Sequence, residues 1–203
     1  MFAFDGSPVP IRDDLRDAHV AIWRHFARPG QVLDANERRT ILKMARNNSY
    51  ADDDGLGRLA STLYGNPAGV SEDMVRSAIA ASGEAAVVET VALASMLAAV
   101  DYTHRALGAS LEPLPEPLHG EPSGNIATGL KKRRTRVSMP TTSITRALDL
   151  LPSENAAYAA ACGPLYMTFA EMSSPFFERS SGLNRAQLET IAARTSLLNE
   201  CFY

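Results

Sequence analysis

The segment "EAAVVETVALASMLAAVDYTHRAL", residues 84–107, decides the fold of this 203-residue chain. Its apolar side chains lie nearly all round a helical wheel instead of forming one stripe, which is typical of a helix buried on every side. Gly108 follows it as a C-terminal stop. A helix of this kind belongs at the centre of a bundle, so the sequence predicts an all-α fold.

Four further helices are predicted ahead of this central segment. Apolar residues recur there at helical spacing, and no stretch alternates with period two over the length of a strand. Capping residues and glycine or proline stops bound these helices. They run from Leu15 to Phe26 before "RPG", from a capping box at Asp34 and Glu37 to Ala45, from Leu56 to Gly65, and from Ser71 to Gly83. We expect residues 1–110 to form one helical unit.

The composition changes between residues 111 and 140. Prolines 113, 115, 117 and 122 stand within ten residues, and neither a helix nor a central strand tolerates that density. The basic run "KKRRTR" follows at Lys131 to Arg136. Such a run is most often a solvated loop, and an anionic partner is the alternative. The segment 111–140 is therefore predicted to be a Pro-rich linker or connecting arm.

Residues 141–203 have the pattern of the start of a second helical unit. Helical periodicity returns near Thr142 to Leu151 and again after Ser153, with an interruption at Gly163 and Pro164. A last helix is expected to run to about Leu198, and Asn199 is a plausible cap for a further one.

The two units look like copies of each other. "FARPGQVLDANERRTILKMAR" (26–46) parallels "FERSSGLNRAQLETIAAR" (177–194), and aligning their Thr-Ile pairs places Asp34 on Asn184 and Glu37 on Gln187. Two capping boxes in register favour a duplication. The second copy would then lack everything equivalent to residues 54–108, so we expect the chain to end inside its second repeat.

Glu189 and Cys201 are the candidate chemical pair. They are twelve residues apart, which on one straight helix would separate them by about 18 Å along the axis. They can approach each other only if the chain turns near Asn199. A cysteine at the second position of the next helix would feel the positive end of the helix dipole, which lowers a thiol pKa. A nearby carboxylate could then move a proton.

The closing stretch "LETIAARTSLLNECFY" (188–203) resembles the active-site entry of the alkyl hydroperoxidase D-like branch of the carboxymuconolactone decarboxylase superfamily. Members of that branch carry a Glu twelve residues before the first Cys of a C-x-x-C motif and a His four residues after the second. Glu189 and Cys201 match the first two elements, and the others would fall beyond Tyr203. Residues 59–108 are similar to the closing helices of the peroxidase-related members. The resemblance covers most of residues 15–108 and 153–203.

The resemblance implies an antiparallel helical bundle and a thiol-dependent peroxidase. Cys201 would belong to the redox pair and Glu189 would assist proton transfer. No bound cofactor would be needed, because electrons come from a thiol reductant partner by exchange. A homo-oligomer, a dimer or higher, is expected, since the central helix needs cover on every side. Without the second Cys and the His, the chain as given should be inactive or nearly so.

The first copy departs from the family pattern. Arg39 stands where the Glu should be and Ala51 where the Cys should be, with Asp54 and Arg58 at the remaining motif positions. That copy therefore looks like a scaffold without redox chemistry. A non-enzymatic helical scaffold or interaction protein is accordingly the second functional hypothesis. A cofactor-free decarboxylase or lactone-acting enzyme of the same superfamily is the third, and it would not need the Cys.

Net charge, the N-terminal sequence and the spacing of the Cys and His residues bear on which partners, compartment and metal sites are expected. A net charge of -3 gives no general attraction to nucleic acid or membranes. The N-terminus lacks the pattern of a signal peptide, so a cytoplasmic protein with two free thiols is the default. Cys162 is expected to pack rather than react, and His104 to be a satisfied or surface histidine. His19 and His25 lack the spacing of a zinc helix, so no metal site is predicted.

Overall fold

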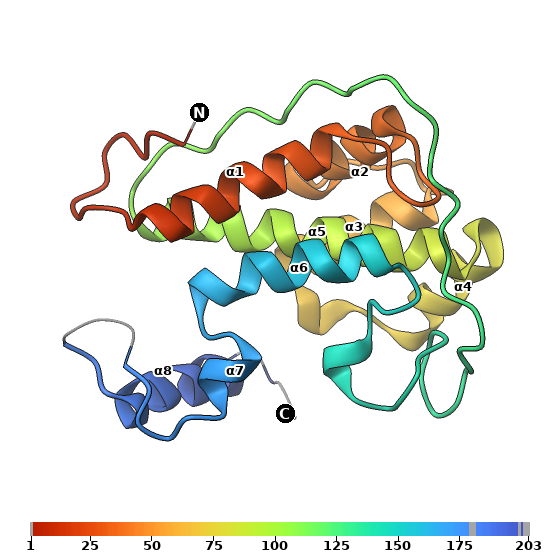
Figure 1. Ribbon diagram of the computed structural model, residues 1–203. Helices are drawn as coiled ribbons and strands as arrows, with labels where there is room; N and C mark the ends of the chain where they lie inside the picture. The colour runs from red at the N-terminus through yellow and green to blue at the C-terminus, as the bar shows by residue number, and fades with distance from the viewer. Residues whose placement is uncertain (1, 179–181, 199, 201–203) are drawn as a thin grey trace.

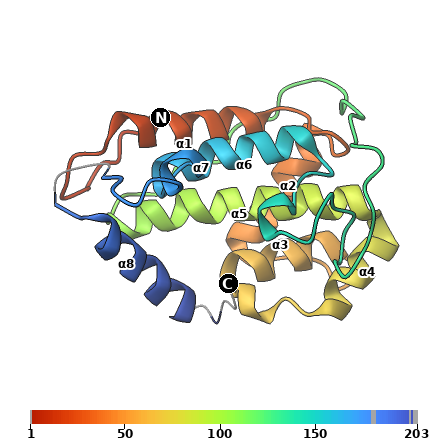
Figure 2. The same ribbon diagram turned by 60° about the horizontal axis from the view of Figure 1, so that its bottom comes forward.

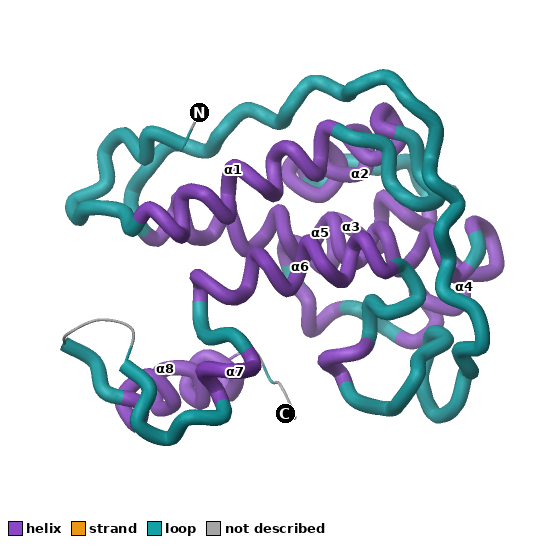
Figure 3. Tube along the Cα trace, viewed as in Figure 1, coloured by secondary structure: helices purple, strands orange, loops and turns teal. Residues whose placement is uncertain are grey.

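The computed structural model describes residues 2–178, 182–198 and 200, and within these its regular elements are all helical (Figures 1 and 3). The helices are α1 (Asp13–Ala27), α2 (Ala35–Asn47), α3 (Gly55–Gly65), α4 (Glu72–Ser82), α5 (Glu84–Ala106), α6 (Pro152–Leu165), α7 (Phe169–Met172) and α8 (Arg185–Leu198), with short 3-10 turns at Pro67–Gly69 and Ile144–Arg146. In this part of the chain β-pairing is limited to one isolated bridge, Lys131 to Met139. The predicted all-α class is confirmed.

Helix α5 is the centre of the fold, as its all-round apolar character predicts. It packs against α1, α2, α3, α4 and α6 (Figure 2), and Leu93, Met96 and Leu97 are completely buried. By length and composition alone α5 could also cross a membrane. Its cover comes from helices of the same chain, so the reason for expecting a second subunit over α5 does not apply.

The helix starts follow from capping side chains. Asp34 accepts hydrogen bonds from the N–H groups of Asn36 and Glu37, and Glu37 completes the capping box. Ser71 caps α4 in the same way, through the N–H of Met74. Because each cap satisfies N–H groups that have no partner inside the helix, the predicted starts of α2 and α4 are confirmed.

The proline-rich segment contains no helix, as predicted, and it runs along α1 (Figure 1). Hydrogen bonds attach it to α1 and to the loop that follows: Trp23 Nε1 donates to the carbonyl of Pro113 at 2.8 Å, Leu118 N to Ala27 O at 2.7 Å, and Ser123 N to Gly30 O at 3.0 Å. The segment is thus bound to the first unit over its first half.

The prediction of a helix near Thr142 to Leu151 is wrong. Only the 3-10 turn Ile144–Arg146 and further turns form there, and α6 begins at Pro152. Leu148, Leu150 and Leu151 are all buried, so tertiary packing of three leucines shapes this stretch. Proline is favoured at the first position of a helix because it has no N–H to leave unpaired. The interruption predicted at Gly163 and Pro164 is also absent, since α6 includes both residues.

Helix α6 packs on α1 and α5. Its Ala161, together with Leu148, Leu150 and Leu151 just before it, belongs to the same hydrophobic cluster as the buried residues of α1, α2 and α5. The core therefore extends across the predicted unit boundaries at residues 110 and 140.

Helix α8 has the predicted start and end. Gln187 N donates to Asn184 Oδ1 at 3.0 Å, and Asn184 N donates to Gln187 Oε1 at 2.9 Å. Its apolar residues are not covered, however: Ile191 is 54% and Leu198 67% exposed. The capping residues and apolar spacing predict the span of this helix correctly, but none of its residues is buried against the rest of the structure.

Candidate functional site

Glu189 lies on α8 with its side chain 45% exposed and both carboxylate oxygens engaged. The hydroxyl of Tyr166, at the end of α6, donates to Oε2 at 2.7 Å. Nε of Arg185, one turn earlier on α8, donates to Oε1 at 2.7 Å. The hydrogen bond from Tyr166, and after it Arg185, lowers the pKa of Glu189, which is therefore a carboxylate at neutral pH.

The Arg185 guanidinium also fixes α8 to the segment before it. Nη1 donates to the carbonyl of Ser174 at 3.2 Å and to that of Glu171 at 3.4 Å. Tyr166 and Arg185 thus hold the Glu189 carboxylate in one orientation relative to the end of α6 and to α7. In the other direction, burial and the hydrogen bond to Glu189 raise the pKa of the Tyr166 hydroxyl.

Cys201, the predicted redox residue, lies outside the described residues. What precedes it is defined: α8 ends at Leu198, Glu200 N donates to Leu197 O at 3.2 Å, and Glu200 has a left-handed backbone with φ 53°. The regular helix of α8 therefore ends three residues before Cys201. The pairing of Glu189 with Cys201 stays a prediction.

Cys162 is a partly buried thiol on α6. Burial raises its pKa, although a hydrogen bond with Tyr158 acts in the opposite direction. A thiol with a raised pKa is protonated at neutral pH and reacts slowly. Cys162 is consequently a matched internal reference for the reactivity of Cys201.

In the first helical unit, the positions that the predicted duplication aligns with the motif make structural contacts. Arg39, at the position of Glu189, forms an ion pair with Glu116 of the proline-rich segment. Ala51, at the position of Cys201, is exposed, and its carbonyl accepts a hydrogen bond from Asp54 N at 3.0 Å. Asp54 in turn caps α3 through the N–H of Gly57.

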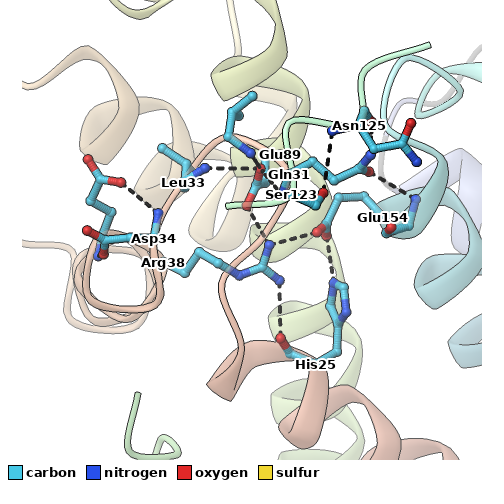
Figure 4. A network of polar contacts seen from close by, with 12 residues as sticks. His25, Gln31, Leu33, Asp34, Arg38, Glu89, Ser123, Asn125 and Glu154 are labelled. Carbon is cyan, nitrogen blue, oxygen red and sulfur yellow. Dashed lines mark hydrogen bonds and ion pairs between the residues drawn. The ribbon is translucent and has the colours of Figure 1, made fainter. Parts of the chain in front are cut away.

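A buried polar network lies elsewhere, in the core, and sequence reasoning missed it (Figure 4). The guanidinium of Arg38 on α2 donates to Glu89 on α5 and, at 2.7 Å, to Glu154 on α6. All three side chains are fully buried. Two carboxylates with a single guanidinium between them join three helices.

The loop before α2 wraps around the Glu89 carboxylate. Oε2 accepts hydrogen bonds from the backbone N–H groups of Gln31, Val32 and Leu33 at 3.1, 2.9 and 3.4 Å. Gly30 begins this loop, and a Cβ on it would lie 1.7 Å from Glu89 Oε1. The glycine is required for the close approach of backbone to carboxylate.

His25 completes the network from α1. Its Nε2 lies 2.9 Å from Glu154 Oε2, and its side chain is 21% exposed. Burial would raise the pKa of Glu154, but the hydrogen bond with His25 and the charge of Arg38 outweigh it and lower the pKa. Since each carboxylate oxygen of Glu89 and Glu154 has a partner, we interpret the network as a structural lock between helices.

One sequence signal could have indicated this lock. Arg38 precedes Ile41, Leu42 and Ala45 at spacings of three, four and seven, so it lies on the buried face of α2. Glu89 likewise stands within the most apolar helix. Charged residues are almost never fully buried unless they are paired. The sequence therefore indicates that Arg38 and Glu89 each have an oppositely charged or hydrogen-bonding partner.

The basic run Lys131–Arg136 forms a loop closed by the antiparallel bridge between Lys131 and Met139. Its Lys and Arg side chains are exposed. Residues 132–136, together with α4, line a hollow of about 510 Å³. Within the part of the chain that the structure describes, no group of three or more His, Cys, Asp or Glu could hold a metal ion.

The chain matches no protein-family model, no curated protein and no solved structure. The resemblance to the alkyl hydroperoxidase D-like branch therefore rests on the residues quoted from the sequence and stays a prediction.

Proposed function

We propose that this protein is a thiol-dependent peroxidase of the alkyl hydroperoxidase D-like type, with an antiparallel duplicated bundle and Cys201 as the reacting thiol. The observation that supports it best is the state of Glu189. The carboxylate is fixed by Tyr166 and Arg185 on the helix that ends three residues before Cys201. An oriented carboxylate can serve as the base for a thiol that comes within hydrogen-bond reach of it.

In this proposal Glu189 takes the proton from the Cys201 thiol, and the thiolate attacks the terminal oxygen of a hydroperoxide. A sulfur–oxygen bond forms as the oxygen–oxygen bond breaks. Glu189 returns the proton to the leaving alkoxide, which departs as an alcohol. The sulfenic acid on Cys201 condenses with a second thiol, releasing water and forming a disulfide, and a thiol reductant partner restores the dithiol by exchange. No cofactor enters these steps.

The test is single-turnover oxidation of Cys201 in a Cys162→Ser background. Cumene hydroperoxide is added, and sulfenic acid at Cys201 is trapped with dimedone and measured by mass spectrometry. Glu189→Gln should slow the reaction on the order of a hundredfold, the usual contribution of a general acid–base group. Glu178→Gln, a change at an exposed carboxylate of the loop before α8, is the control. Equal rates in the two variants would remove Glu189 from the mechanism.

The second candidate, a non-enzymatic helical scaffold, is favoured by a different feature of the same carboxylate. Both oxygens of Glu189 are already occupied by Arg185 and Tyr166, as in a purely structural ion pair. A scaffold would show slow, equal labelling of Cys201 and Cys162 by iodoacetamide near neutral pH.

We also propose that the protein is a homo-oligomer that associates through α8. Helix α8 leaves Ile191, Leu197 and Leu198 largely exposed, and apolar clusters of this kind often mark association surfaces. The test is to measure the mass of the unchanged chain and of the double variant Leu197→Ser, Leu198→Ser by sedimentation equilibrium. The unchanged chain should be an oligomer and the variant a monomer, and a monomeric unchanged chain would contradict the proposal.

A further inference from the structure

Two histidines form a buried pair between α1 and α5. His19 and His104 have exposed fractions of 0% and 1%. Their ring centroids lie 5.8 Å apart, with 25° between the ring planes. Buried imidazoles normally find hydrogen-bond partners, because each ring carries polar nitrogens.

Within the described residues, three of the four ring nitrogens of this pair make no hydrogen bond. His104 Nδ1 lies 3.0 Å from the carbonyl of Val100, and since a carbonyl only accepts, Nδ1 carries the proton and Nε2 a lone pair. Among residues 2–178, 182–198 and 200, neither that Nε2 nor either nitrogen of His19 has a hydrogen-bond partner. Three nitrogens, which together offer at least one donor and two acceptors, are thus sealed in the core.

The cover over this pair is two phenylalanine rings from the N-terminal segment. Phe4 stacks on His104 with centroids 4.4 Å apart, and Phe2 meets Trp23 edge-on at 5.1 Å. Both phenylalanines have left-handed backbone, with φ 57° and 54°, a conformation that bulky residues rarely adopt. Apolar rings held in a strained backbone therefore cover polar atoms that they cannot satisfy.

We propose that the His19–His104 pair is the polar end of a binding pocket for a small phenol, which the N-terminal residues Phe2 to Phe4 close by occupying it themselves. The ring of the ligand takes the space of the phenylalanine rings, and its hydroxyl, which is both a donor and an acceptor, hydrogen-bonds with nitrogens of the pair that have no partner among the described residues.

The charge of the pocket fits this ligand class. Burial and the neighbouring His104 lower the pKa of His19 to about 4, so His19 is neutral at pH 7. Charged groups nearby already have partners: Glu112 accepts from Phe2 N, and Arg46 lies over Trp23 and pairs with Asp101. A neutral donor–acceptor ligand is therefore favoured over an ion.

The pocket is independent of the proposed peroxidase chemistry. It is built from α1, α5 and the N-terminal segment, and it includes neither Glu189 nor Cys201. Failure of either proposal leaves the other intact.

The experiment uses 4-fluorophenol as the probe and fluorobenzene, which lacks the hydroxyl, as its control. Binding is followed by fluorine NMR and by the emission of Trp23, the only tryptophan of the chain. Phe2→Gly with Phe4→Gly vacates the pocket and suits the left-handed backbone. This variant should bind 4-fluorophenol at least about tenfold more tightly than the unchanged chain, because the segment no longer competes, and more tightly than it binds fluorobenzene. Adding His104→Phe should abolish the preference for the phenol.

Equal binding of the two probes, or no gain over the unchanged chain, overturns the proposal. Circular dichroism checks that the double variant keeps its helices. If the double variant loses its helices, the thermal stability of His104→Phe in the otherwise unchanged chain is measured instead. That substitution removes an unpaired buried acceptor and keeps a stacking ring, so the thermal midpoint should rise, and a fall would contradict the account.

Discussion

Arg38 and Glu89 form an ion pair between α2 and the central helix α5, and both side chains are fully buried. The same guanidinium bonds Glu154 on α6, so one arginine compensates two buried carboxylates. A buried pair gives little net stability compared with apolar residues, but removing one partner leaves an uncompensated charge in the core.

Arg38→Met should therefore destabilise the fold by about 3–5 kcal/mol, measured by urea unfolding at pH 7.5. Arg76→Met is the matched control, because Arg76 pairs with Glu72 and Asp73 on the exposed face of α4, where such pairs contribute about 0–1 kcal/mol. Similar losses in the two variants would show that the buried network is not the lock between helices.

Gly30→Ala should disrupt the same network from the backbone side. The added Cβ would meet Glu89 Oε1 and Arg38 Nη1, and overpacking of this kind costs about 1–3 kcal/mol or more. Gly65→Ala is the control, since nothing lies within 4 Å of its added Cβ, and its effect should stay within about 0.5 kcal/mol. A neutral Gly30→Ala would mean that the loop does not need to approach Glu89 so closely.

Stability should fall with acid because of His19. Its pKa is about 4 in the folded protein and 6.5 in an unfolded chain, so the unfolded state binds more protons between these values. The contribution is complete above pH 6.5 and is lost as pH falls toward 4, by about 3 kcal/mol in the limit. His19→Phe should flatten the pH dependence of the unfolding free energy between pH 7 and 5. An unchanged slope would show that His19 is not held neutral.

Tyr166→Phe should raise the pKa of Glu189, because the hydroxyl hydrogen bond is the largest cause of its lowering. The measurement is a carbon-13 NMR titration of the glutamate side-chain carboxyls. Tyr158→Phe, on α6 beside Cys162, should leave the Glu189 titration unchanged. A pKa of Glu189 that does not respond to Tyr166→Phe would remove Tyr166 from the site.

The helices α1 to α5 and α8 could be predicted because local signals define them. Periodic apolar residues and caps such as Asp34, Ser71 and Asn184 act over a few residues of chain. The stretch before Pro152 could not, because its conformation follows from burial of Leu150 and Leu151 against helices far away in sequence.

The sites divide in the same way. Glu189 could be singled out as a candidate because its spacing to Cys201 is a property of the sequence. The link between Arg38 and Glu154, 116 residues apart, depends on where α6 packs, and the covering of His104 by Phe4 depends on the path of the N-terminal segment. Neither of these contacts has a local signal, although a charge on an apolar face indicates that a partner must exist.

The proposed function is tested most directly by comparing the two thiols. The rate of oxidation by cumene hydroperoxide at pH 7 is measured for Cys201 in Cys162→Ser and for Cys162 in Cys201→Ser. Burial raises the pKa of Cys162, whereas a thiol peroxidase requires a thiolate at Cys201. The expected inactivity concerns turnover, which needs the second Cys; for this single oxidation step the account predicts that Cys201 reacts faster on the order of a hundredfold. Equal, slow oxidation of both thiols would contradict it and would favour the scaffold.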